Sequence, residues 1–127
     1  MSPVRVLIAD DDEIFRDALA DFIRDEESME LVGEAADATG AVALARELEP
    51  DVAVVDVKMP GGGRQACEGI IAQSPRTRVL VLSAYDDEAT VRQLRQAGAC
   101  GHLVKGTSST DLTASILAAA PDGTQGR

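Results

Sequence analysis

Five short runs of apolar residues recur along the chain, and each is followed by a stretch in which apolar residues have helical spacing. The runs are Val4–Ala9, Met29–Ala35, Val52–Val55, Val79–Leu82 and Gly101–Val104. After the first run, the helical pattern is carried by Ile14, Ala18, Leu19, Phe22 and Ile23. Short runs rich in β-branched residues indicate strands, whereas apolar residues three and four positions apart indicate one face of a helix. Regular strand–helix alternation predicts a parallel sheet with helices on both faces.

The second run differs from the others and predicts the order of the strands. In residues 29–35, every second side chain belongs to an apolar set, and the side chains between them include Glu30 and Glu34. The runs at 52, 79 and 101 are instead continuously apolar. Alternation indicates a strand that is half exposed, and such a strand belongs at a sheet edge. We therefore predict a flavodoxin-like (βα)5 fold with strand order 2-1-3-4-5. A length of 127 residues suits one domain, which we place at residues 1–120, with residues 121–127 as a tail or linker.

Residues with known preferences mark the ends of the predicted helices. Asp86 is suited to cap the start of the fourth helix, and Ser108 or Ser109 the start of the fifth. Gly98 follows the fourth helix, where a residue with a left-handed backbone is favoured.

Composition excludes several classes of function. The chain has 22 acidic residues against 12 Lys and Arg, a net charge of −10, which disfavours direct binding of nucleic acid or of an anionic membrane. Cys67 and Cys100 are far apart and there is one histidine, so neither a disulfide framework nor a thiolate zinc site is expected. Both cysteines are predicted to be small buried residues. No run resembles a signal peptide or a membrane span, and we expect a cytoplasmic protein.

Acidic residues stand where two neighbouring strands of the predicted sheet end. Asp10 and Asp11 follow the first strand, and Asp56 follows the third. In this strand order, ligands bind beyond the carboxyl ends of strands one and three, which lie about 4.8 Å apart. Three carboxylates in one pocket repel one another unless a cation joins them, and oxygen ligands favour Mg²⁺. The acids at positions 10–13 also suit the start of a helix, whose dipole favours negative charge.

The two remaining strands add groups that suit phosphoryl transfer. Ser83 ends the fourth strand, and Lys105 ends the fifth. A metal ion and an ammonium group neutralise phosphoryl oxygens, a hydroxyl group donates a hydrogen bond to one of them, and a carboxylate can accept the phosphoryl group.

At these positions the sequence resembles the receiver domain of two-component response regulators. The resemblance covers about residues 3 to 120, and its first and last motifs are most similar to the subfamily that precedes a LuxR-type helix-turn-helix domain. The motifs are VLIADDD at Val6–Asp12, VVDVKMPG at Val54–Gly61, VLSA at Val81–Ala84 and GACGHLVK at Gly98–Lys105.

The resemblance implies a role for each acidic residue of the site. Asp56 would be the phosphoacceptor and would attack a phosphohistidine on a sensor histidine kinase. Asp11 would bind Mg²⁺ directly and Asp10 would assist it. The backbone carbonyl of Lys58 would be a further metal ligand.

The resemblance also implies a switch, with some departures from the common pattern. Ser83 would contact a phosphoryl oxygen and move toward it, and Lys105 would pair with the phosphoryl charge. His102 stands where an aromatic switch residue is usual, Gly106 follows the lysine, and residues 61–64 depart from the usual loop. We expect His102 to fill the space that Ser83 leaves.

The family resemblance implies a phosphoacceptor that is not an enzyme in the ordinary sense. Its output would be transcriptional regulation through a DNA-binding domain absent from this chain. Phosphorylation would favour a homodimer through the first and fifth helices or the face of the fourth. Two alternatives are an Mg²⁺-dependent phosphatase with an aspartate nucleophile, and a stand-alone or pseudo-receiver that acts by protein–protein interaction.

Overall fold

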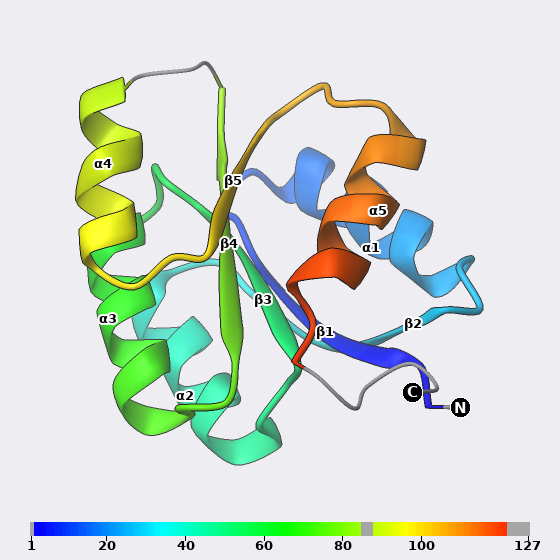
Figure 1. Cartoon of the computed structure of the whole chain (residues 1–127), viewed down its shortest axis with the longest axis horizontal. Coiled ribbons are helices and arrows are strands. Elements are labelled where there is room, and N and C mark those ends of the chain that lie inside the picture. Colours follow the sequence, from blue (N-terminus) through cyan, green and yellow to red (C-terminus); the bar gives the residue numbers. More distant parts are fainter. Residues whose placement is uncertain (1, 85–87, 122–127) are drawn as a thin grey trace.

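A five-stranded parallel sheet lies between two layers of helices in the computed structural model (Figure 1). The structure describes residues 2–84 and 88–121. Helices α1 and α5 cover one face of the sheet, and α2, α3 and α4 cover the other. The elements are β1 (Val4–Ala9), α1 (Glu13–Arg24), β2 (Met29–Ala35), α2 (Ala38–Leu48), β3 (Val52–Asp56), α3 (Gly63–Gln73), β4 (Arg78–Ser83), α4 (Glu88–Gln96), β5 (Gly101–Val104) and α5 (Ser109–Ala119).

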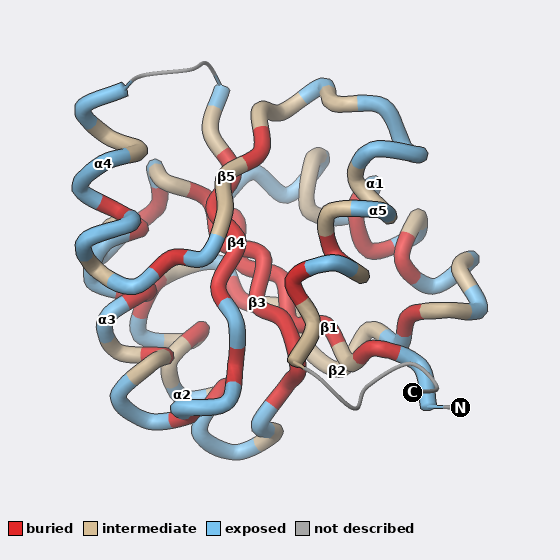
Figure 2. The backbone as a smooth tube through the Cα atoms, viewed as in Figure 1, coloured by how far each residue is buried: buried red, intermediate tan, exposed pale blue. Residues whose placement is uncertain are grey.

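The strand order is β2-β1-β3-β4-β5, as predicted. The edge position of β2 is confirmed, and its middle residues are only partly buried. Strand β3 is buried along its whole length because it lies at the centre of the sheet, with helices over both faces (Figure 2). Its neighbours β1 and β4 pair with it in register, with Val55 opposite Ala9 on one side and Val81 on the other. The three strands therefore end at the same edge.

Alternate residues of the strands divide the core between the two helical layers. Leu7 of β1 and Val55 of β3 pack with α2, α3 and α4, whereas Ile8 and Val54 pack with α1 and α5. This two-sided burial is why the inner strands read as continuous apolar runs.

The apolar stripe of α1 lies farther along the helix than the sequence predicted. Leu19, Ala20 and Ile23 are its buried residues. Ile14 was assigned to this stripe, but it is 84% exposed, so that assignment is wrong. Ala18, four residues farther along and also assigned to the stripe, is exposed as well, so the side of α1 that carries Ile14 and Ala18 does not face the sheet. Cys100 is also exposed, contrary to prediction, whereas Cys67 is buried.

Polar side chains cap the helices that begin near the site. The carboxylate of Asp12 accepts hydrogen bonds from the backbone N–H groups of Ile14 and Phe15 and so fixes the start of α1. Ser108 caps α5, as one of the two predicted residues, and Gly98 has the predicted left-handed backbone, with φ 111°. The predicted cap Asp86 lies outside the described residues.

None of the helices in the described ranges has the length and apolar character that crossing a bilayer requires. The predicted domain boundary at residue 120 stays a prediction, since residues 122–127 lie outside the described part of the chain.

Candidate functional site

Three carboxylates meet at the carboxyl edge of the sheet, where the sequence predicted them. Asp10 and Asp11 follow β1, and Asp56 is the last residue of β3. One carboxylate oxygen from each lies within 4.8 Å of those of the other two. Asp10 and Asp56 are 1% and 4% exposed, whereas Asp11 is on the surface. The cluster therefore has two acids in the protein interior and one at the entrance.

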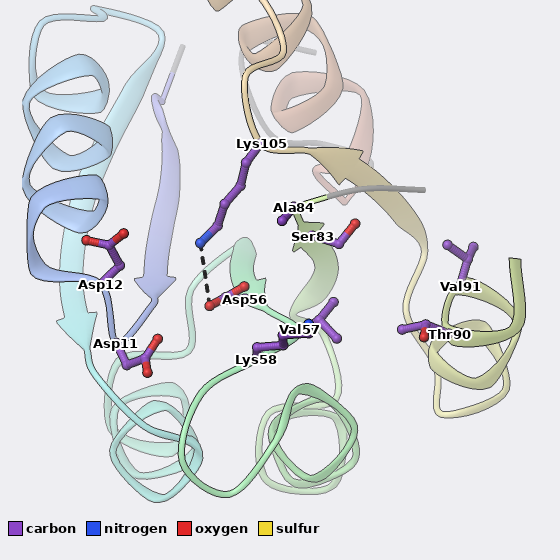
Figure 3. A pocket seen from close by; sticks show the side chains of 10 residues that line it. All are labelled: Asp11, Asp12, Asp56, Val57, Lys58, Ser83, Ala84, Thr90, Val91 and Lys105. Atoms are coloured by element: carbon purple, nitrogen blue, oxygen red, sulfur yellow. Dashed lines mark ion pairs between the residues drawn. The ribbon is translucent and has the colours of Figure 1, made fainter. Parts of the chain in front are cut away.

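Lys105 reaches into this cluster from the loop after β5 (Figure 3). Its Nζ atom lies 2.9 Å from Oδ2 of Asp10 and 3.6 Å from Oδ2 of Asp56. The same ammonium group lies 4.5 Å from the centre of the Phe15 ring. The backbone N–H of Lys105 donates to the carbonyl oxygen of Ser83 at 2.7 Å, which ties the start of this loop to the end of β4.

Burial and the charge of a neighbouring acid shift the pKa of Asp56 upward. Burial is the largest cause, and the nearby negative charge of Asp10 adds to it, so the pKa rises from 3.8 to about 6. Lys105 and a backbone N–H of Lys58 act in the opposite direction but do not cancel the effect. Burial lowers the pKa of Lys105, and attraction to Asp10 and Asp56 outweighs burial and raises it. The acids at the site thus carry more negative charge than the ammonium group of Lys105 neutralises.

The residues present fit a hard divalent cation. Oδ2 of Asp10 is buried and, apart from its ion pair with Lys105, has no well-aligned hydrogen bond in the described part of the chain. The cluster offers carboxylate oxygens alone, which are the ligands preferred by Mg²⁺ and Ca²⁺. A bound cation would also relieve the repulsion that raises the pKa of Asp56.

A cavity of about 250 Å³ opens beside Asp11 and Asp56 of this cluster. Figure 3 shows Asp56 and Lys105 approaching each other across it, with Asp11 and Asp12 on one side and α4 on the other. The lining residues are Asp11, Asp12, Asp56, Val57, Lys58, Ser83, Ala84, Thr90, Val91 and Lys105. Lys58 and Ser83 thus lie where the sequence placed them. Tyr85, which the sequence placed near the mouth of the pocket, lies outside the described residues.

Ser83 and His102 are joined directly. Oγ of Ser83 lies 2.8 Å from Nε2 of His102, although the two residues are 19 positions apart. Strands β4 and β5 pair with Val81 opposite His102, so the imidazole lies beside the end of β4. Sequence reasoning predicted that the two residues act together, but it missed this hydrogen bond. The contact depends on strand register, for which the sequence carries no local signal.

Sequence reasoning also missed residues of α1 and α4 that contact or line the site. Arg16 donates to the backbone carbonyl of Asp10 at 2.8 Å and so fixes the turn after β1. Phe15 lies against Lys105, and Thr90 and Val91 of α4 close one side of the cavity. Each of these residues falls inside a helical pattern, where no feature distinguishes it from an ordinary helix residue.

The glycine run at 61–63 sets the course of the loop that follows Asp56. Gly61 and Gly62 have φ angles of 90° and 82°, which favour glycine. Gly63 is buried and begins α3, and a Cβ atom there would lie 2.8 Å from the Cα atom of Val57. The glycine therefore lets α3 start against the backbone next to Asp56.

Comparison with known proteins identifies the family. The family model described as the response regulator receiver domain matches residues 6–117. The chain therefore belongs to the response regulator receiver domain family, and it is a receiver domain of the two-component type.

Individual relatives agree with this assignment. The chain is 34% identical over 114 residues to the response regulator GacA of Pseudomonas aeruginosa, covering 89% of this chain and 53% of that protein. It is 36% identical to the signal receiver domain of the response regulator NarL from Mycobacterium tuberculosis, with a TM-score of 0.88 over 93% of this chain and 96% of that one. A LuxR-family response regulator from Aurantimonas is 32% identical, with a TM-score of 0.85 over 92% and 84% of the two chains. The chain spans about half the length of the curated relatives it matches.

Proposed function

We propose that Asp56 accepts a phosphoryl group from a phosphohistidine of a sensor histidine kinase. The observation that carries this proposal is the position of Asp56, buried at the end of β3 beside the acids after β1 and within reach of the ammonium group of Lys105. One oxygen of its carboxylate attacks the phosphorus atom. The P–N bond of the donor breaks, its electron pair leaves with the imidazole, and an acyl phosphate remains on Asp56. Water later hydrolyses this acyl phosphate and releases inorganic phosphate.

Mg²⁺ is the cofactor proposed for this step, held by carboxylate oxygens of Asp10, Asp11 and Asp56 and by the backbone carbonyl of Lys58. The bound ion supplies positive charge beside the transferring oxygens. The three-carboxylate cluster and the raised pKa of Asp56 support this assignment. Lys105 provides the second positive charge, from its place beside Asp10 and Asp56.

Ser83 and His102 form the proposed switch. The hydroxyl of Ser83 lines the same cavity as Asp56, so it is placed to contact a phosphoryl oxygen. We propose that Ser83 moves toward the phosphoryl group. The hydrogen bond between Ser83 and His102 links this movement to β5. A phosphoryl group therefore favours a different arrangement of β5 and α4 because the new contact exists only in the phosphorylated state.

The output belongs to the whole protein and is part of the proposal. The LuxR-family relative supports transcriptional regulation through a DNA-binding domain outside this chain. We also propose that phosphorylation favours a homodimer and that the protein acts in the cytoplasm.

Incubation with acetyl phosphate and Mg²⁺, followed by intact mass measurement, tests the phosphoacceptor. The wild-type chain should gain the mass of one phosphoryl group, and hydroxylamine should remove it, as expected for an acyl phosphate. Asp56→Asn should gain none. Asp51→Asn is the matched control, because Asp51 is another buried aspartate, one residue before β3, and should leave phosphorylation intact. Phosphorylation of Asp56→Asn at the wild-type level would contradict the proposal.

A further inference from the structure

The ammonium group of Lys105 has a third neighbour besides the two carboxylates. The face of the Phe15 ring lies 4.5 Å from Nζ, within the range in which a cation is attracted to an aromatic ring. The lysine side chain is 22% exposed, so it has room to move away from the acids. What holds the ammonium group in place therefore matters for any reaction at Asp56.

The position of Phe15 is fixed by the start of α1. The Asp12 carboxylate caps this helix and accepts a hydrogen bond from the backbone N–H of Phe15. The ring packs against the core layer under α1 and α5, which lie side by side (Figure 1). Phe15 and Lys105 also line a second cavity of about 280 Å³ between these helices. Lys105 thus stands between two cavities, with Phe15 on the side away from Asp56.

The three neighbours of Lys105 respond differently to a metal ion. A divalent cation on Asp10 and Asp56 neutralises the charges that attract the ammonium group, and it repels the group as well. The ring of Phe15 carries no net charge and offers no ligand to such a cation. Its attraction for the ammonium group therefore persists when the attraction of the carboxylates is lost.

We propose that Phe15 is a positioning residue that keeps the Lys105 ammonium group at the edge of the site when a divalent cation occupies the carboxylates. This role rests on the proposed phosphoryl transfer to Asp56. Without the ring, Lys105 spends more of its time extended into solvent, and the fraction of molecules ready for transfer falls. The expected effect is a slower phosphorylation step at saturating Mg²⁺, with an unchanged affinity for the ion.

Nuclear magnetic resonance tests the contact without any reaction. The chain has two lysines, Lys58 and Lys105, so isotope-labelled lysine gives two sets of signals. The ε-methylene protons of Lys105 should be shifted upfield by the Phe15 ring, both without and with Mg²⁺, and Lys58 serves as the internal reference. The shift should vanish in Phe15→Leu and persist in Phe15→Tyr.

Phe22→Leu is the matched control for lost aromatic volume. Phe22 is also a half-buried phenylalanine of α1, packs on the same core layer and lines the same cavity between α1 and α5. In the described part of the chain, the aromatic ring in contact with the Lys105 ammonium group is that of Phe15 and not that of Phe22. Phe22→Leu should therefore leave the Lys105 signals upfield, and equal folding of all variants is checked by thermal unfolding.

Phosphorylation rates complete the test. With acetyl phosphate and saturating Mg²⁺, Phe15→Leu should react about two- to tenfold more slowly than wild type, the range that a cation–π contact allows. Phe15→Tyr and Phe22→Leu should react at nearly the wild-type rate. Equal rates in Phe15→Leu and Phe22→Leu, or an upfield shift in wild type that Mg²⁺ abolishes, would overturn the role of Phe15. A wild-type chain that accepts no phosphoryl group would instead overturn the function proposed for Asp56.

Discussion

Replacing Asp56 with asparagine should stabilise the chain at neutral pH in the absence of divalent cations. The Asp56 carboxylate is 4% exposed and shares its pocket with Asp10, and these two causes raise its pKa to about 6. Ionised Asp56 therefore lowers the free energy of unfolding of the chain. Asparagine has nearly the same shape and no charge. Asp56→Asn therefore keeps the packing and removes the unfavourable free energy of burying an ionised carboxylate.

The size of this effect follows from the pKa values. A carboxyl group with a pKa of 3.8 when unfolded and about 6 when folded binds its proton more tightly in the folded chain. Stability therefore falls as the pH rises through this window, and the full cost of about 3 kcal/mol is present above pH 6. Below about pH 3 the group is protonated in both states, and at pH 4 most of this free-energy difference is already lost, so Asp56→Asn should then have nearly the stability of wild type.

Urea unfolding followed by circular dichroism at pH 4 and pH 7.5 measures this difference directly. Asp51→Asn is the control, because its buried carboxylate accepts a hydrogen bond from the backbone of Arg5 at 2.9 Å and pairs with Arg76 at 2.8 Å. That substitution removes favourable contacts and should destabilise the chain by about 1–3 kcal/mol at pH 7.5. The reasoning is refuted if Asp56→Asn is no more stable than wild type at pH 7.5, or if its advantage is the same at both pH values.

Further substitutions test the metal site, the loop and the switch. Asp11→Ala should weaken Mg²⁺ binding at least tenfold in calorimetric titration with little loss of stability, because Asp11 is exposed; unchanged affinity would exclude Asp11 as a ligand. Gly63→Ala should lower the free energy of unfolding by about 1–3 kcal/mol, since its new Cβ would meet the backbone of Val57; equal denaturation midpoints would contradict this. His102→Ala should reduce the amide shifts that beryllofluoride and Mg²⁺ cause in α4, because the hydrogen bond to Ser83 is lost; unchanged shifts would show that the switch bypasses His102.

The sequence determined the fold because its signals are local. Apolar runs and helical spacing depend on neighbouring residues, and the alternating pattern of residues 29–35 distinguished an edge strand from buried ones. The chemical content of the site was also predictable. Parallel strands all end at one edge, so residues that follow them, such as Asp10, Asp56 and Lys105, must gather there.

Only the tertiary structure decided how these groups contact one another. The Ser83–His102 hydrogen bond depends on the register of two strands, and the contact of Phe15 with Lys105 depends on where α1 packs against the sheet. The pKa of Asp56 depends on burial and on the distance to a second carboxylate, neither of which is a property of adjacent residues. These features arise from packing between segments far apart in the chain, where differences of a few ångströms decide whether a contact exists.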